Sequence, residues 1–221
     1  MAIYLKKFEN HTQYENYING SGAILPNVSI CTTEGNVHYN PYVPPTPVET
    51  RVIAKFYVTN AGATVHIADE PSCFSSIEID GVEQSEVTDS YDFSTVGEHT
   101  LKYTLIDPTI ICDYTFEYCD SLTSIDIPNS VTSIGEQAIA YDYNLTSIEI
   151  PSGVTSIGEK AFNECRSLTS ITVNATIPPT LGSNAFSNTN LSTIYVPSES
   201  VNAYKVAEGW SEYASAIEPI S

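Results

Sequence analysis

Positively charged side chains are scarce in this sequence. Its 221 residues include 8 Lys and Arg against 27 Asp and Glu, which gives a formal net charge of −19 at pH 7. A charge of this sign repels the phosphate backbone of nucleic acids and the anionic surface of membranes. The composition therefore predicts no nucleic-acid partner and no attraction to an anionic membrane.

Long apolar runs are also missing. No stretch approaches the length needed to span a bilayer, so we expect no membrane insertion. Residues 1–10 lack the apolar core of a classical signal peptide. Three explanations are compatible with this: the protein stays inside the cell, it is exported or assembled by another route, or its leader is absent from this sequence.

Patterns that carry chemistry are absent as well. The four histidines lie outside metal-binding spacings and catalytic motifs, and no glycine-rich phosphate loop occurs. An acidic run at residues 80–92 lacks the regular ligand spacing of a calcium loop. It favours a solvated acidic face, with a calcium site as the alternative. We therefore predict no enzymatic activity, no cofactor and no metal site.

What the sequence does contain is a period of 23 residues. The segment Leu-Thr-Ser-Ile-Asp-Ile-Pro that starts at Leu122 returns with variations at Leu145, Leu168 and Leu191. A fixed period of this length is typical of a solenoid, in which each unit is too small to bury its own apolar face. Solenoids present long regular surfaces, so the period favours binding over catalysis.

Each unit alternates apolar and polar residues, as a half-buried strand requires. Stacking the units predicts an apolar column of the four leucines and a second column of isoleucines, namely Ile125, Ile148, Ile171 and Ile194. Ile111 and Phe116 indicate a partial unit before the first full one. The third unit departs from the pattern, because Phe186 arrives one position late and the following turn is one residue shorter.

The five cysteines show no C-x-x-C pattern, and their odd number argues against a complete disulfide framework. Cys119 and Cys165 are 46 residues apart, which is two periods, with Asp142 at the intervening turn. We interpret both as buried packing residues, because free cysteine is among the most buried residue types.

The chain before the repeats divides by composition. Residues 1–40 mix strand-like and helix-like segments and predict a small α+β module. Residues 41–47 hold four prolines and predict an extended linker. Residues 48–107 alternate with period two over several short segments, which predicts a β-sandwich. We expect this sandwich to abut the first partial repeat and to shield the open edge of the solenoid.

The repeat wording L-T-S-I-x-I-P-x-x-V-T-S-I-G-x-x-A-F-x-x-C resembles the BspA-type leucine-rich repeat over residues 108–197. Members of that family are typically bacterial surface or secreted proteins implicated in adhesion and in binding host proteins. The tail, residues 198–221, is similar to the family's usual ending. We expect it to form a helical cap over the last repeat, with an apolar face of Val201, Tyr204, Trp210, Tyr213 and Ile217.

Two further resemblances concern the earlier regions. Residues 91–103 look like the closing strands of bacterial immunoglobulin-like domains, so the sandwich is expected to be immunoglobulin-like. The opening residues resemble a leader module found on proteins of gut bacteria and their phages. The resulting fold class is mainly β: an α+β module, a β-sandwich, and a short parallel leucine-rich-repeat solenoid with a helical cap.

The outward strand positions of the repeats are the candidate partner-binding site. They would line one sheet face about 15 Å across, at roughly 4.8 Å between strands. Tyrosine is an effective interface anchor, which favours a binding role for this face. The alternative is that these are ordinary solvated strand positions that bind no partner. The candidate residues are Ser124, Asp126, Ser147, Glu149, Ser170, Thr172, Thr193 and Tyr195.

The function predicted from these patterns is a non-enzymatic protein-binding or adhesion module of a bacterial or phage surface. The expected partner is a host or bacterial surface protein. The alternative is a structural component of a virion or surface assembly, anchored through the N-terminal module, which is also where copies of the chain would associate. The expected location is the cell surface, the secreted fraction or the virion.

Overall fold

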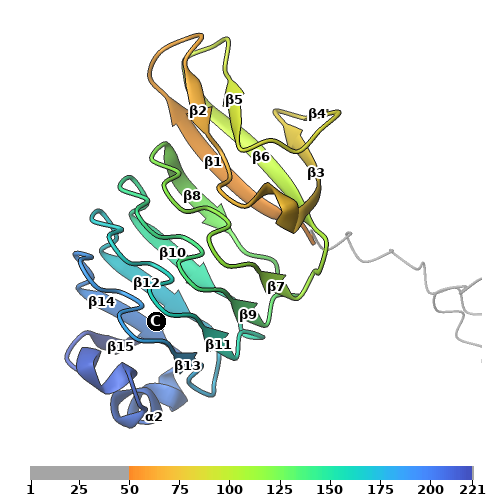
Figure 1. Cartoon of the computed structure of the whole chain (residues 1–221). Helices are drawn as coiled ribbons and strands as arrows, with labels where there is room; N and C mark the ends of the chain where they lie inside the picture. The colour runs from red at the N-terminus through yellow and green to blue at the C-terminus, as the bar shows by residue number, and fades with distance from the viewer. Residues whose placement is uncertain (1–49, 221) are drawn as a thin grey trace, which may run out of the picture. The chain divides into compact units, whose positions relative to one another are not determined.

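The computed structural model describes residues 50–220 (Figure 1). The predicted α+β module and proline-rich linker lie outside these residues. The described strands form a nine-stranded sheet in the order β15-β14-β12-β10-β8-β1-β6-β3-β4, a four-stranded sheet in the order β13-β11-β9-β7, and the pair β2-β5. One apolar core joins the buried faces of all three.

Of the residues before the repeats, the described range 50–107 supplies six strands. In the large sheet β1 pairs with β6, β6 with β3, and β3 with β4, all antiparallel, whereas β2 pairs with β5. Val52, Ala54 and Phe56 of β1 are buried. The alternation with period two in the sequence therefore corresponds to the side of the strand that faces the core. The immunoglobulin likeness of this region stays a prediction. The strands are β1 Val52–Val58, β2 Thr64–His66, β3 Phe74–Ile79, β4 Val82–Glu83, β5 Ser90–Asp92 and β6 Gly97–Leu105, with a short 3-10 helix at Pro71–Cys73.

Each repeat contributes one strand to each of two parallel stacks. The long strands are β8 Leu122–Asp126, β10 Ser147–Ile150, β12 Ser170–Val173 and β14 Thr193–Val196. The short strands are β7 Ile110–Ile111, β9 Ser133–Ile134, β11 Ser156–Ile157 and β13 Thr180–Leu181. Figure 1 shows the two stacks running side by side along the solenoid. The predicted parallel solenoid and its partial first unit are therefore confirmed.

The register of the stacks follows the sequence period. Ile148 lies beside Ile171, and Ile171 beside Ile194, in steps of 23 residues. Between β11 and β13 the step is 24, since Ile157 lies beside Leu181. The late arrival of Phe186 therefore reflects one inserted residue, and the short turn that follows restores the period before β14.

The two predicted apolar columns are present. Leu122, Leu145 and Leu168 are completely buried, whereas Leu191 at the end of the array is only partly buried. The four isoleucines of the second column are also buried. On the opposite wall the rings of Phe162 and Phe186 stack with centroids 5.3 Å apart. The repeats thus fill one continuous core.

The preceding strands join the solenoid directly. β1 pairs antiparallel with β8, placing Ile53 beside Asp126 and Lys55 beside Ser124. This pairing covers the first edge of the repeat sheet, as expected. A disulfide between Cys73 and Cys112 also links the region to the first partial repeat. The sequence patterns did not predict that bond.

The end of the chain differs from the expected single helix. The helix α2 covers only Val201–Val206, and Gly209 reverses the chain at φ 77° before a 3-10 helix, Trp210–Tyr213. Ile217 belongs to a further strand, β15 Ile217–Pro219, which pairs in parallel with β14. The expectation that Ile217 lies on the helix is therefore wrong, because an added strand satisfies the open edge of β14 and a helix does not.

Candidate protein-binding face

The structure places the eight candidate residues on one face of the large sheet. Parallel register aligns them in two rows, and this solvent-facing surface of β8, β10, β12 and β14 is called the repeat face below. The first row is Ser124, Ser147, Ser170 and Thr193, and the second is Asp126, Glu149, Thr172 and Tyr195. None of the eight is buried.

Exposure is not equal along the repeat face. Asp126, Ser147, Glu149 and Tyr195 are exposed, whereas the other four are half-buried. Tyr195 is 39% exposed as a whole residue, so part of it contacts the protein and part remains available to a partner. Glu149 accepts a hydrogen bond from Asn174 Nδ2 at 2.6 Å, which holds its carboxylate in place.

The polar face continues beyond the repeats onto β1, β6 and β3. There Arg51 and Lys102 both bind Glu78, with N–O distances of 2.9 and 2.8 Å, and Lys55 binds Glu98 at 3.0 Å. Hydrogen bonds from Lys102 and Arg51 lower the pKa of Glu78. Sequence reasoning missed this extension because the pairing of β1 with β8 is not visible in the repeat pattern.

The Thr and Ser of each Leu-Thr-Ser-Ile segment have different roles. The Thr169 hydroxyl donates to the Thr146 carbonyl at 3.3 Å, and the Ser192 hydroxyl at the next equivalent position donates to the Thr169 carbonyl at 3.1 Å. The short-strand segments repeat the arrangement, since Thr155 donates to the Thr132 carbonyl at 3.2 Å. In the long-strand segments the first hydroxyl residue therefore links neighbouring repeats, and the second one lies on the repeat face. In the short strands the second one links repeats as well, since the Ser156 hydroxyl donates to the Ser133 hydroxyl at 2.9 Å.

Turns between the strands form a second regular surface. Tyr118 and Tyr141 occupy equivalent turns, both with positive φ, and their rings stack with centroids 4.4 Å apart and planes at 15°. Arg166 lies over the ring of Tyr143 at 5.4 Å and binds Glu164 at 2.8 Å. This row of turns is called the turn ridge below.

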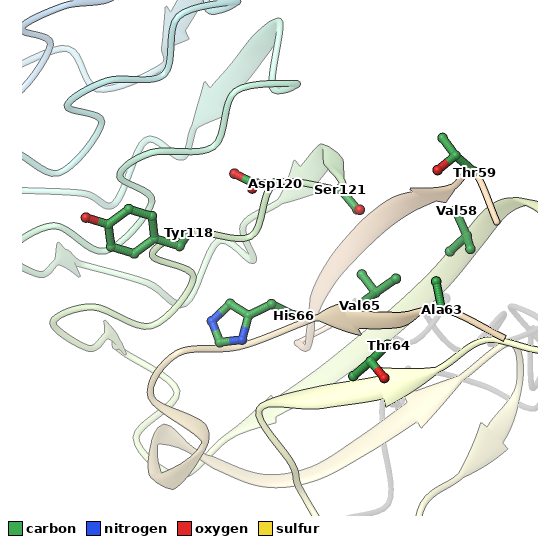
Figure 2. A pocket seen from close by; sticks show the side chains of 9 residues that line it. All are labelled: Val58, Thr59, Ala63, Thr64, Val65, His66, Tyr118, Asp120 and Ser121. Atoms are coloured by element: carbon green, nitrogen blue, oxygen red, sulfur yellow. The ribbon is translucent and has the colours of Figure 1, made fainter. Parts of the chain in front are cut away.

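A pocket of about 360 Å³ lies where the turn ridge meets the preceding strands (Figure 2). Its walls are the end of β1, strand β2 and the turn before β8. Figure 2 shows Tyr118, Asp120 and His66 at one end and Val58 and Ala63 toward the other. The lining residues are Val58, Thr59, Ala63, Thr64, Val65, His66, Tyr118, Asp120 and Ser121.

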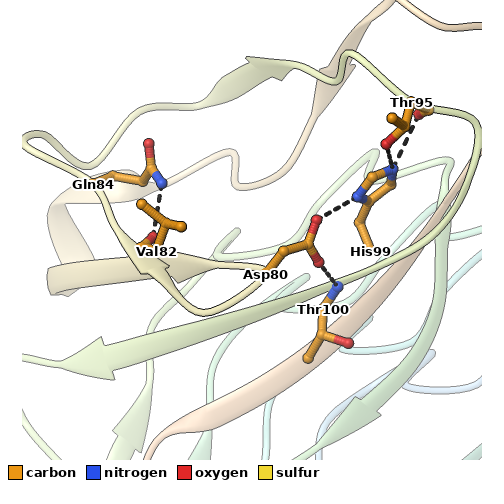
Figure 3. Close-up of polar contacts among 6 residues, drawn as sticks. All are labelled: Asp80, Val82, Gln84, Thr95, His99 and Thr100. Atoms are coloured by element: carbon orange, nitrogen blue, oxygen red, sulfur yellow. Dashed lines mark hydrogen bonds and ion pairs between the residues drawn. The ribbon is translucent and has the colours of Figure 1, made fainter.

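A buried histidine elsewhere has a structural role. His99 Nδ1 lies 2.6 Å from Asp80 Oδ2, its Nε2 lies 3.1 Å from the Thr95 carbonyl, and the Thr100 amide donates to Asp80 Oδ1 (Figure 3). Burial would lower the pKa of His99, but these hydrogen bonds outweigh it and raise the pKa. The contacts tie β6 to the turn after β3.

Residues 50–220 contain no group of three or more His, Cys, Asp or Glu side chains arranged to hold a metal ion. None of the helices in the same range has both the length and the apolar character needed to cross a bilayer.

Comparison with known proteins agrees with the repeat architecture. A family model described as the BspA type leucine rich repeat region, in six copies, matches residues 89–207. The matched range is more than half of the chain, and the chain belongs to the BspA-type leucine-rich repeat family. Repeats of this class indicate a module for binding other proteins or for adhesion.

One similar solved structure is a leucine-rich repeat protein from Bacteroides ovatus, determined by crystallography. It is 30% identical with a TM-score of 0.38, and the alignment covers 51% of this chain and 28% of that chain. The chain thus matches less than a third of that protein's length. Among curated proteins, none matches this sequence.

Proposed function

We propose that this protein is a non-enzymatic protein-binding or adhesion module whose partner contacts the repeat face near its C-terminal end. The observation that carries the proposal is the register of outward side chains over four parallel strands, the last of which carries the exposed Tyr195. A flat array of short hydroxyl side chains beside an aromatic anchor suits a protein surface, because tyrosine buries a large area with few rotatable bonds.

Charge favours the part of the repeat face around Thr172 and Tyr195. Asp126 and Glu149 lie in the same row on β8 and β10, Thr172 and Tyr195 are the uncharged members of that row, and the exposed Glu218 of β15 lies beside Tyr195. Desolvating a carboxylate in an interface is costly, so the core of the contact is expected on the uncharged pair, with Glu149 and Glu218 at its rim. Asp126 then acts at the rim, where it changes the association rate more than the affinity.

We further propose a location on the cell surface, in the secreted fraction or on a virion. The Cys73–Cys112 disulfide supports this proposal, because such bonds persist mainly in oxidising compartments. The family's leucine-rich repeats and the strongly acidic composition are compatible with a surface-displayed binding module. We also propose that residues 48–107 are immunoglobulin-like.

The test begins with a pull-down from host extracellular matrix and bacterial surface extracts, followed by affinity measurement with the identified protein. Tyr195→Ala is expected to weaken binding by about 1 kcal/mol or more, on the order of tenfold. Thr172→Arg should weaken it by steric conflict and charge, whereas Ser147→Ala on the acidic half serves as the control. An affinity unchanged by both Tyr195→Ala and Thr172→Arg would show that the partner binds elsewhere.

The alternative is a structural role in an assembly anchored through the N-terminal module. Light scattering after size exclusion distinguishes the two, applied to the full chain and to a chain that begins at Val48. An oligomer that is lost with the first 47 residues would favour assembly. A monomer in both cases would favour the binding module.

A further inference from the structure

We propose that the pocket beside Tyr118 receives an arginine or lysine side chain of a protein partner, with the Tyr118 ring as a cation–π platform and Asp120 as the counter-charge. This second contact site rests on the proposed function only in taking a protein as the partner. It lies on the turn ridge and not on the repeat face, so the two sites can be tested separately.

The geometry leaves one face of the Tyr118 ring available. Tyr141, one repeat further along the solenoid, stacks on the ring with centroids 4.4 Å apart and is not part of the pocket wall. Tyr118 itself lines the pocket, opposite β2, and is 49% exposed. The stack therefore holds one face of the ring against Tyr141, and we infer that a flat guanidinium or an ammonium group from the pocket can lie over the other face.

The charge of the pocket selects a cation. Asp120 lines it, and His66 at its wall lies 3.4 Å from Asp69, which adds a second carboxylate nearby. No Lys or Arg is among the lining residues. A phosphate or a carboxylated sugar would meet these carboxylates with His66 as the one lining side chain able to carry a positive charge, whereas a basic side chain would complement them.

The turn ridge already contains the proposed arrangement in another repeat. Arg166 lies 5.4 Å from the centroid of the Tyr143 ring while its Nε donates to Glu164 at 2.8 Å. Asp120, Tyr143 and Arg166 occupy equivalent positions, one period apart. A tyrosine and a carboxylate on this ridge thus hold a guanidinium supplied by the chain itself. At Tyr118 the described residues supply no such group, and a partner would provide it.

The experiment compares two short acetylated and amidated peptides, Gly-Arg-Gly and Gly-citrulline-Gly, by amide NMR titration of the full chain. Citrulline keeps the shape of arginine and removes its charge. The arginine peptide should shift the amides of residues 64–66 and 118–121, and the citrulline peptide should not. Tyr118→Leu should weaken binding by about three- to tenfold and Tyr118→Phe should not, since the phenylalanine ring retains the cation–π face.

Two matched variants separate the pocket from general attraction to an acidic protein. Asp120→Asn is expected to weaken binding severalfold, whereas Asp126→Asn removes the same charge from the repeat face and should leave affinity within about twofold. Tyr195→Ala should also leave it unchanged. Equal binding of arginine and citrulline peptides, or equal losses in Asp120→Asn and Asp126→Asn, would overturn the proposal.

A neutral disaccharide such as lactose is the competing probe. Tyr118-dependent shifts with lactose and none with the arginine peptide would identify a sugar site and overturn the proposal. If Tyr118→Leu does not fold, the proposal is still tested by the difference between the arginine and citrulline peptides and by the retained binding expected of Tyr118→Phe. The two proposals fail separately. If the peptides bind as expected but Tyr195→Ala does not change the affinity for the protein partner, only the repeat-face proposal is rejected.

Discussion

Asp142 is the residue that fits its surroundings least well. It is completely buried at the position that Cys119 and Cys165 occupy in the neighbouring repeats, and both of those cysteines are free and buried, as expected for packing residues. Among the described residues neither Asp142 carboxylate oxygen makes a hydrogen bond of ordinary geometry, and only the Cys119 backbone amide acts on the carboxyl in the direction that lowers its pKa. Burial raises the pKa of Asp142 well above its ordinary value, because the charged form loses its hydration.

Replacing this side chain should stabilise the protein at neutral and alkaline pH. In the unfolded chain Asp142 ionises near pH 4, whereas the folded state holds the proton to higher pH. Wild-type stability therefore falls as pH rises from about 4 toward the folded-state pKa. Asp142→Cys should remove this loss and raise the free energy of unfolding at pH 8 by about 1–3 kcal/mol.

The measurement is urea unfolding of both proteins at pH 5 and pH 8. The His99–Asp80 pair also loses its contribution as pH rises, because the pKa of His99 is raised, so the difference between variant and wild type is the relevant quantity. Asp126→Asn serves as the control, because it removes an exposed carboxylate of the repeat face that is not among the charges acting on Asp142. A stabilisation that does not grow between pH 5 and pH 8 would refute the explanation.

Gly158 is required by close stacking of successive turns. A Cβ there would lie 2.5 Å from the backbone of Gly135, and the equivalent Gly182 meets Gly158 in the same way. Gly158→Ala should therefore lower stability by about 1–3 kcal/mol or more, since the backbone has to move. Gly153→Ala is the matched control, because its Cβ would lie no closer than 3.3 Å to any neighbour. Thermal unfolding should show the larger loss for Gly158→Ala, and equal losses would contradict this account.

At the scale of the element, the leucine column carries the stability of the repeat strands. Leu145 and Leu168 are completely buried, so Leu145→Ala or Leu168→Ala should cost about 2–5 kcal/mol. Ser147→Ala, two residues from Leu145 on the exposed side, should be close to neutral. Denaturant midpoints measure the three variants. Small and equal shifts for all of them would be incompatible with the observed burial.

At the scale of the whole molecule, the disulfide joins the strands before the repeats to the solenoid. Cys73 and Cys112 lie 39 residues apart in the sequence. Cross-linking a loop of this length lowers the conformational entropy of the unfolded chain, which stabilises the folded state by about 2–4 kcal/mol. The double variant Cys73→Ser/Cys112→Ser should lose stability by about that amount. Cys165→Ala is the comparison variant, because it removes a free buried thiol and leaves the disulfide intact. Reductant should destabilise the wild type and leave the double variant unchanged, and an insensitive wild type would contradict the assignment.

The period determined the solenoid, its two apolar columns and the outward rows of the repeat face, because equal units that cannot bury their own apolar side must stack in register. It also located the inserted residue before Phe186. These features depend on contacts between positions one period apart, and the sequence displays that spacing directly. The functional role of the repeat face does not follow from the same pattern, since solvated and partner-binding strand positions look alike.

Only the tertiary structure decided what lies at the two ends of the repeats. The pairing of β1 with β8, the Cys73–Cys112 bond and the pocket beside Tyr118 join segments roughly 40 to 70 residues apart, without any repeated spacing between them. At the other end, the apolar spacing of Tyr204 and Ile217 suited a helix, yet the unpaired edge of β14 took Ile217 as a strand. The pairing of distant strands and the hydrogen bonding of open sheet edges depend on which surfaces meet after folding, and local periodicity does not encode them.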